Sequence, residues 1–272
     1  MKGYFKALRL PAGIFFFLLV ISSYNIAGKN PLEAMLPAFT TLVIYSATVV
    51  WNNWCDRNRD AISGNDFALK NEVRFLLFSK YLWLFAGLLT ISLCFQEHGQ
   101  DKFLIALAMF VLGIGYQMTE KIVGLPIIMV AITSAISTLF PLTNGEPYWR
   151  SILFSALVFF VMCPREIMKD FEDKERDADE RFGKATLPLI IKEKKSLIVA
   201  RVLLVIAAMI NTALLTGTSP SNQIMSFSLV MIIATLLSMT EEHQLKRAQM
   251  TLNYGLFGAV LLGLTWPFFF HL

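Results

Sequence analysis

The sequence LPAFTTLVIYSATVVW (residues 36–51) runs directly into NNWCDRNRD (residues 52–60). The first part, together with the residues before it, is apolar for long enough to cross the ~30 Å hydrocarbon core of a bilayer as a helix. The second part brings asparagine, aspartate and arginine side chains together. This junction predicts a membrane protein with a charged site at the end of a spanning helix.

Composition extends the prediction to the whole chain of 272 residues. Hydrophobic residues make up 56% of it and charged residues only 16%, which is too little charge to cover the surface of a soluble domain of this size. Apolar runs of spanning length recur along the sequence. We expect nine membrane-spanning helices, at residues 8–27, 33–54, 75–95, 102–118, 124–142, 149–167, 197–216, 222–240 and 250–270.

Basic residues indicate the orientation of these helices, because Lys and Arg concentrate in cytoplasmic connections. With nine spans, all but three of the 24 basic residues fall on the side of the N-terminus. The exceptions are Lys29, Lys102 and Arg150. We therefore expect the N-terminus and the long connections in the cytoplasm and the C-terminus on the opposite side.

The fold class that follows is an all-α, multi-pass integral membrane protein with a single domain, residues 1–272. One polar cluster follows the second span and another follows the sixth, at the same place in a four-helix unit. This correspondence predicts two four-helix halves plus one helix around a central cavity. Spans one to four then carry the first acidic motif, and spans five to nine carry the second.

The first cluster has helical spacing. Asn52, Asp56 and Asp60 are separated by four residues each, so on a helix they project from one face. Three oxygen-bearing side chains would then point together at the end of the span.

The second cluster, REIMKDFEDKERD (residues 165–177), repeats this arrangement. Asp170, Asp173 and Asp177 share one helical face, and Glu166 lies one turn earlier. Two acidic faces would repel each other if they met unpaired. Mg²⁺ would relieve that repulsion, because it takes oxygen ligands from carboxylates and substrate phosphates together.

Basic residues surround the two acidic clusters, and they suit a polyanion because Arg and Lys bind phosphate oxygens strongly. They are Arg57, Lys121, Arg165, Lys169 and Lys184. Carboxylates and bases beside a membrane cavity therefore predict a Mg²⁺–diphosphate site. Solvated helix ends and an ion-coupled transporter are the competing interpretations, but a transporter would place its acids nearer the bilayer midplane.

These motifs resemble those of the UbiA superfamily of intramembrane prenyltransferases. NNWCDRNRD is similar to its NDxxDxxxD motif, and REIMKDFEDKERD followed by GKATLP is similar to its second motif. Tyr116 and Lys121 resemble a Tyr and Lys after the fourth helix. Arg9 with Pro11 resembles the Arg-Pro that opens the first helix.

Three departures from the family pattern affect the expected site. Asn53 stands where the family usually has Asp. The loop after Asp60 lacks the family's basic pattern, which makes Lys70 or Arg74 the alternative diphosphate contact. Two extra residues before the GKATLP segment make Asp179 an alternative to Asp177 as a ligand.

The resemblance implies a prenyltransferase that uses two Mg²⁺ ions and an isoprenyl diphosphate donor. The expected catalytic residues are Asp56, Asp60, Asp170, Asp173 and Asp177. The expected metal ligands are Asn52, Asp56, Asp60, Asp173 and Asp177. The expected diphosphate-binding residues are Arg9, Asn53, Lys70, Tyr116, Lys121, Arg165, Lys169 and Lys184.

The resemblance further implies a carbocation-like step and a hydrophobic acceptor from the bilayer, either an aromatic or quinone precursor or a glycerol-phosphate lipid. The prenyl tail would lie in an apolar groove between helices, and membrane lipid would surround the protein. A proton released by the acceptor would pass to Glu166 or Asp170. A membrane terpene cyclase of the same fold is the alternative, and no nucleic acid is expected as a partner.

Overall fold

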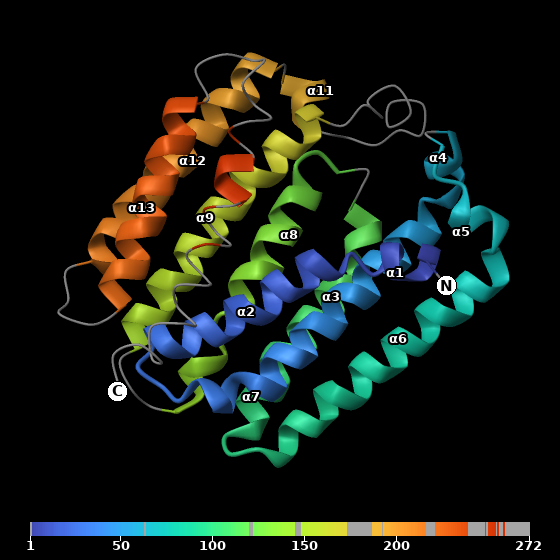
Figure 1. Cartoon of the computed structure of the whole chain (residues 1–272), viewed down its shortest axis with the longest axis horizontal. Coiled ribbons are helices and arrows are strands. Elements are labelled where there is room, and N and C mark those ends of the chain that lie inside the picture. The colour runs from blue at the N-terminus through green and yellow to red at the C-terminus, as the bar shows by residue number, and fades with distance from the viewer. Residues whose placement is uncertain are drawn as a thin grey trace.

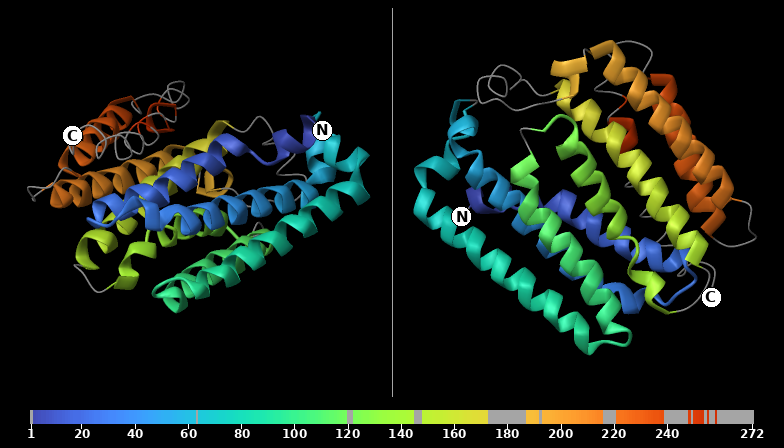
Figure 2. Two further views of the ribbon diagram at one scale, coloured as in Figure 1. Left: turned by 60° about the horizontal axis from the view of Figure 1, so that its bottom comes forward. Right: turned by 180° about the vertical axis from the view of Figure 1, so that it is seen from behind.

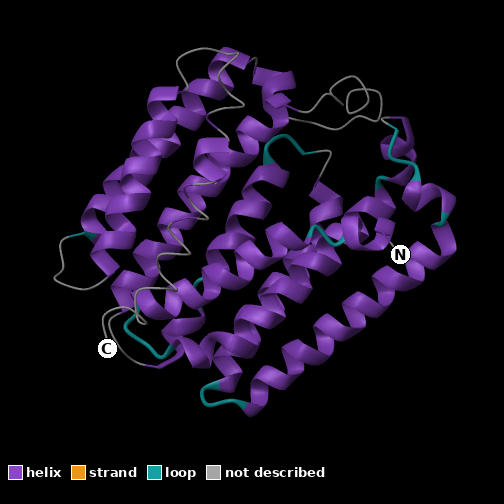
Figure 3. Ribbon diagram, viewed as in Figure 1, coloured by secondary structure: helices purple, strands orange, loops and turns teal. Residues whose placement is uncertain are grey.

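The computed structural model describes residues 2–62, 64–119, 122–144, 148–172, 187–191, 193–215, 221–238, 248, 250–253, 255 and 258. Helices and short connections make up this part of the chain, and it contains no strand (Figure 3). The α-helices are α1 (Lys2–Ala7), α2 (Leu10–Ile26), α3 (Met35–Cys55), α4 (Arg57–Ile62), α5 (Phe67–Lys70), α6 (Glu72–Ser92), α7 (Gly99–Gly115), α8 (Leu125–Ile136), α9 (Tyr148–Glu172), α11 (Leu187–Ile191), α12 (Glu193–Leu214) and α13 (Ser221–Ser238). The 3₁₀ turns are η1 (Pro31–Ala34), η2 (Leu93–Phe95), η3 (Tyr116–Thr119) and η4 (Phe140–Asn144).

The first eight predicted spans each contain one long helix, namely α2, α3, α6, α7, α8, α9, α12 and α13. Most of the ninth, 250–270, lies outside the described residues, so the total of nine stays a prediction. Within the described residues, five helical segments are long and apolar enough to cross a membrane. They are Pro31–Cys55, Glu72–Phe95, Gly99–Thr119, Trp149–Phe171 and Lys194–Leu214.

The fifth predicted span differs most from the structure. Residues 124–142 were expected as one helix, but α8 ends at Ile136 after 12 residues and the chain continues in η4. Pro141 explains the break, because proline lacks an N–H and disfavours helical backbone at the residue before it. The α8 helix is about 18 Å long at 1.5 Å per residue, shorter than the hydrocarbon layer.

Two large hydrophobic cores lie among the described residues, beside a smaller cluster of Ala7, Val50, Ala68 and Phe75. One core joins α2, α3, α6 and α7, with Val20 and Ile44 fully buried in it. The other joins α2, α8, α9, α12 and α13 around Phe16 and Leu204. Helix α2 therefore lies between the two groups (Figure 1). The arrangement as two four-helix halves plus one helix around a central cavity stays a prediction, and α2 contributes to both cores.

The outer face of α6 is apolar, which is the reverse of a helix on a soluble protein. Side chains three or four residues apart form an exposed stripe along it: Leu77, Tyr81, Leu84, Leu88 and Ile91. A stripe of this kind is stable against lipid chains and unfavourable in water. In Figure 2, α6 and α13 lie at opposite edges of the bundle.

The two helices that carry the acidic motifs run in the same direction. In Figure 1, α3 ends near α4 and α9 ends near α11, toward the same side of the molecule, where α6 begins. The fold therefore places the first motif and the described part of the second at the same end of the bundle.

Candidate functional site

The first acidic motif lies where α3 gives way to α4. Helix α3 ends at Cys55, and Asp56 is its C-cap with φ −85° and ψ 1°. The expectation of one continuous helix through Asp60 is therefore wrong, because Asp60 belongs to α4. Asparagine and aspartate have low helix propensity, which favours a break here. The Asp60 N–H still donates to the Asp56 carbonyl at 2.9 Å, so the turn between them is kept.

A chain of hydrogen bonds holds the side chains of this motif. Asn52 Nδ2 donates to Asp56 Oδ2 at 2.8 Å, and Arg59 Nη2 donates to the same oxygen at 2.5 Å. Gln117 Nε2, from the turn after α7, donates to Asn52 Oδ1. Asp56 and Arg59 are 7% and 8% exposed. The acidic charge at this position is thus compensated by a base three residues later in the chain.

The second motif begins inside α9, which continues through Glu172 instead of ending near residue 167. The segment contains good helix formers, including Glu, Met and Lys, and pairs Glu166 with Lys169 at i, i+3. Pro164 precedes the motif within the helix. Because proline lacks an N–H, it removes one hydrogen bond of the helix at that point.

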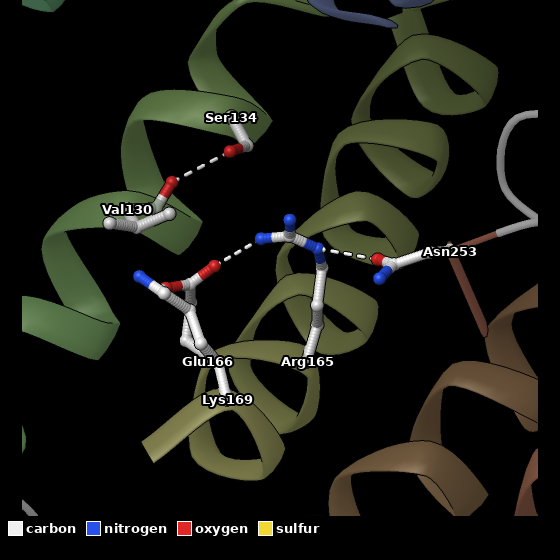
Figure 4. A network of polar contacts seen from close by, with 6 residues as sticks. All are labelled: Val130, Ser134, Arg165, Glu166, Lys169 and Asn253. Carbon is white, nitrogen blue, oxygen red and sulfur yellow. Dashed lines mark hydrogen bonds and ion pairs between the residues drawn. The ribbon is translucent and has the colours of Figure 1, made fainter. Parts of the chain in front are cut away.

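Glu166 is the centre of the second network (Figure 4). Its carboxylate accepts a hydrogen bond from Arg165 Nη1, and Lys169 Nζ lies 3.6 Å from Oε2. Arg165 Nε donates to Asn253 Oδ1 at 2.8 Å. Glu166 is 8% exposed, and a buried carboxylate of this kind requires such cationic partners.

Helix α2 begins near the second network. Arg9 is its N-cap, in the left-handed conformation with φ 44°, and Pro11 lies in the first turn, as the LRLP segment predicts. The Arg9 guanidinium interacts electrostatically with Glu166. Tyr45 of α3 lies within the electrostatic range of Arg9, Arg165 and Glu166. Three helices thus contribute to one charged region.

Two of the predicted diphosphate-binding residues, Asn53 and Lys70, have partners outside the two networks. Asn53 Nδ2 donates to the Ala7 carbonyl at 3.4 Å, which ties α3 to α1. Lys70 Nζ lies 2.5 Å from Asp66 Oδ2 on an exposed surface.

The structure also describes two further predicted residues, Tyr116 and Asp170. Tyr116 is the C-cap of α7 and is directly followed by Gln117. Asp170 lies in the last turn of α9 and is partly buried. Four predicted residues and one alternative lie outside the described part of the chain: Lys121, Asp173, Asp177, Lys184 and Asp179.

Sequence reasoning missed three residues of the networks. Gln117 is adjacent to Tyr116 in the GYQMTEK segment, and a polar side chain after an apolar helix was its only signal. Arg59 was counted as an orientation charge, although it lies three residues after Asp56. Asn253 is isolated in an apolar segment 88 residues from its partner Arg165, and no spacing rule connects the two.

The described residues supply part of the set of oxygen ligands that a hard cation requires. Asp56, Asp60 and Asn52 supply carboxylate and amide oxygens, which Mg²⁺ prefers. No group of three or more His, Cys, Asp or Glu side chains that could hold a metal ion occurs among the described residues. Asp173 and Asp177, expected to complete the set, lie beyond them.

An apolar groove of about 510 Å³ lies between α1 and α6. It is lined by Tyr4, Phe5, Leu8, Arg74, Leu77, Phe78 and Tyr81. Tyr4 packs edge-on against Phe67 and Phe78, and the same cluster includes Val50 of α3. The groove therefore adjoins the helix that carries the first motif.

The described residues thus form a multi-pass helical bundle with two partly buried carboxylate–guanidinium networks. The chain belongs to the UbiA prenyltransferase family, whose model matches residues 14–257. The predicted family is thus confirmed, and the chain is an integral membrane enzyme of the prenyltransferase class.

Two relatives are both named digeranylgeranylglyceryl phosphate synthase. The one from Sulfolobus acidocaldarius is 32% identical over 155 residues, which are 56% of this chain and 52% of that protein. The one from Pyrococcus horikoshii is 30% identical over 200 residues, which are 70% of this chain and 68% of that protein. The chain therefore matches about half of the first relative and about two thirds of the second.

Solved structures share the fold. The apo structure of a UbiA homologue from Aeropyrum pernix covers 97% of this chain and 99% of its own with a TM-score of 0.76 at 14% identity. A UbiA homologue from Archaeoglobus fulgidus, bound to GPP and Mg²⁺, has a TM-score of 0.69 at 15% identity, with 97% of this chain and 99% of its own covered.

Proposed function

We propose that this enzyme transfers a prenyl group from an isoprenyl diphosphate to a hydroxyl of a glycerol-phosphate lipid, with Mg²⁺ as cofactor. The observation that carries the proposal is the family match over residues 14–257, which includes both polar motifs. The names of the two relatives support a glycerol-phosphate acceptor. The homologue bound to GPP and Mg²⁺ supports the donor and the metal.

In this mechanism the charged residues promote cleavage of the bond between the prenyl carbon and the diphosphate oxygen. The donor C–O bond breaks, diphosphate leaves with the electron pair, and the acceptor oxygen forms the new C–O bond and releases its proton. Bound Mg²⁺ would neutralise the charge that grows on the diphosphate. Asn52, Asp56 and Asp60, with Asp173 and Asp177 beyond the described residues, would hold the metal.

The basic residues on and near α9 would bind the negatively charged diphosphate. Arg165 and Lys169 would contact the diphosphate oxygens from the second motif, and Arg9 would approach from α2. Glu166 is a poor candidate for the proton acceptor, because two cations stabilise its charged form. Asp170, one turn further along α9, is the better candidate.

The test uses purified protein in nanodiscs with allylic diphosphates of 10 to 20 carbons, following the prenyl series. Released diphosphate is measured with Mg²⁺ or with EDTA, with and without a glycerol-phosphate lipid or an aromatic acid. We expect release that requires Mg²⁺ and a prenylated glycerol-phosphate lipid as product. Release that yields a cyclic hydrocarbon without acceptor would instead identify a terpene cyclase.

Matched variants link the reaction to the motif. Asp56→Asn and Asp60→Asn should each lower turnover by about 100-fold or more, because each removes a carboxylate from the region that handles the diphosphate. Asp66→Asn is the control, since the Asp66 side chain is 45% exposed and its ion pair with Lys70 lies outside the two networks. Equal losses in all three variants would contradict the assignment.

A further inference from the structure

The Arg165 guanidinium is fixed on two of its three nitrogens. Nε donates to Asn253 and Nη1 donates to Glu166. A guanidinium is planar, so two bonds from different nitrogens set both its position and the orientation of its plane. Its third nitrogen, Nη2, has no hydrogen-bond partner among the described residues, and the side chain is 27% exposed.

The two anchors come from different parts of the chain. Glu166 is the next residue along α9 and moves with the helix that carries Arg165. Asn253 lies in the helical residues 250–253, far along the sequence. In Figure 4, the Asn253 amide approaches Arg165 from the side opposite Glu166 and Lys169. The C-terminal segment therefore supplies a bond that α9 cannot make for itself.

The bond to Asn253 also has a clear energetic role. Without it, the side chain of Arg165 keeps a single anchor at its neighbour Glu166 and can rotate about that contact. Arginine has a large side-chain entropy, and an arrangement that is ordered before ligand binding loses less of it on binding. An amide oxygen achieves this order without cancelling the positive charge, whereas a second carboxylate would cancel it.

We propose that Asn253 is a positioning residue, which holds Arg165 so that its Nη2 edge is presented to the diphosphate of the donor. This inference rests on the proposed function, because it assigns the anion that Arg165 meets. Asn253 touches Arg165 and acts through it. The C-terminal segment is thereby part of donor recognition, together with the two acidic motifs.

The test separates a positioning role from a structural one. Asn253→Leu should raise the KM for the allylic diphosphate about tenfold, with kcat and the unfolding temperature nearly unchanged, as expected when one hydrogen bond to a charged group is lost. Asn253→Gln keeps an amide oxygen and should restore most of the affinity. Combining Asn253→Leu with Arg165→Leu should raise KM no further than Arg165→Leu alone.

The matched control is Asn211→Leu. Asn211 is fully buried in α12, and its Nδ2 donates to Ser228 of α13 at 2.7 Å. This change should lower the unfolding temperature and leave the KM for the donor unchanged. An unchanged KM in Asn253→Leu, or equal KM increases in the Asn211 and Asn253 variants, would overturn the inference.

A readout without turnover keeps the two proposals distinguishable. If the wild-type protein released diphosphate from no donor, the proposed function would fail. The probe is then inorganic diphosphate with Mg²⁺. The measurement is the increase in unfolding temperature that this probe produces. A loss of stabilisation in Asn253→Leu but not in Asn211→Leu supports the positioning role, and equal stabilisation in wild type and Asn253→Leu refutes it.

Discussion

The carboxylate of Asp56 lies 2.5 Å from the guanidinium of Arg59, and more than nine tenths of each residue is buried. A cation that binds Asp56 must therefore compete with an arginine that is already in place. Arg59 compensates the charge of this buried carboxylate. If Asp56 is a metal ligand as proposed, the affinity for Mg²⁺ would depend on Arg59, which is not a ligand.

Arg59→Gln should have opposite effects on stability and on metal binding. Without Mg²⁺ the variant should lose about 3 kcal/mol of unfolding free energy, because one partner of a buried ion pair is removed. With the competitor gone, the Mg²⁺ concentration for half-maximal stabilisation should fall severalfold. Thermal unfolding across a Mg²⁺ titration measures both effects.

Arg57→Gln is the comparison for that experiment. Arg57 pairs with Glu72 at 2.7 Å, but the Glu72 side chain is 48% exposed, and exposed pairs contribute little to stability. This variant should leave the Mg²⁺ midpoint unchanged. A higher Mg²⁺ midpoint in Arg59→Gln would show that Arg59 assists the metal instead of competing with it.

Gln117 fixes the orientation of the Asn52 side chain, and its loss should weaken metal binding. In Gln117→Leu, the Asn52 amide loses the donor that holds Oδ1, and it can rotate away from its orientation toward Asp56. We expect the Mg²⁺ requirement to rise about tenfold, as is typical when a residue that orients a metal ligand is removed. Met118→Leu tests the same turn at an 81% exposed position, and its Mg²⁺ requirement should match the wild type.

Glu166→Gln separates two roles for this carboxylate. If Glu166 only compensates Arg165 and Lys169, removal of its charge should strengthen binding of the diphosphate and change kcat by less than about tenfold. If Glu166 accepts the acceptor proton, kcat should fall by about 100-fold or more. We expect the first result, measured as kcat and KM with Glu97→Gln, an exposed position, as control.

The parts of the site that could be predicted from sequence are those with short-range spacing. Helical periodicity placed Asn52 and Asp56 together, and the LRLP segment placed Arg9 at the start of α2. The break after Cys55 was missed, because helical spacing alone does not show where a helix ends. The bond between Arg165 and Asn253 was unpredictable, since it depends on how distant helices pack.

The helices of the bundle were likewise predictable only in part. Hydrophobic run lengths located the long helices well, because the thickness of the bilayer sets their length. They did not predict that α9 continues through its charged turns or that α8 stops early. In both cases local residues decided the outcome: paired charges in α9 and Pro141 after α8.

Close packing of α3 against α7 predicts a selective effect of Gly113. A Cβ added at Gly113 would overlap the Thr48 hydroxyl and lie 3.0 Å from the Trp83 ring. Gly113→Ala should therefore separate α7 from α3, lower the unfolding temperature, and displace the turn that carries Gln117. Gly115→Ala is the matched control two residues away, where the nearest atom would be 3.8 Å from the new Cβ. It should be neutral or stabilising by up to about 1 kcal/mol, because alanine favours helix over glycine. Thermal unfolding of both variants measures the contrast, and equal stability of the two would show that α3 and α7 are not in close contact at Gly113.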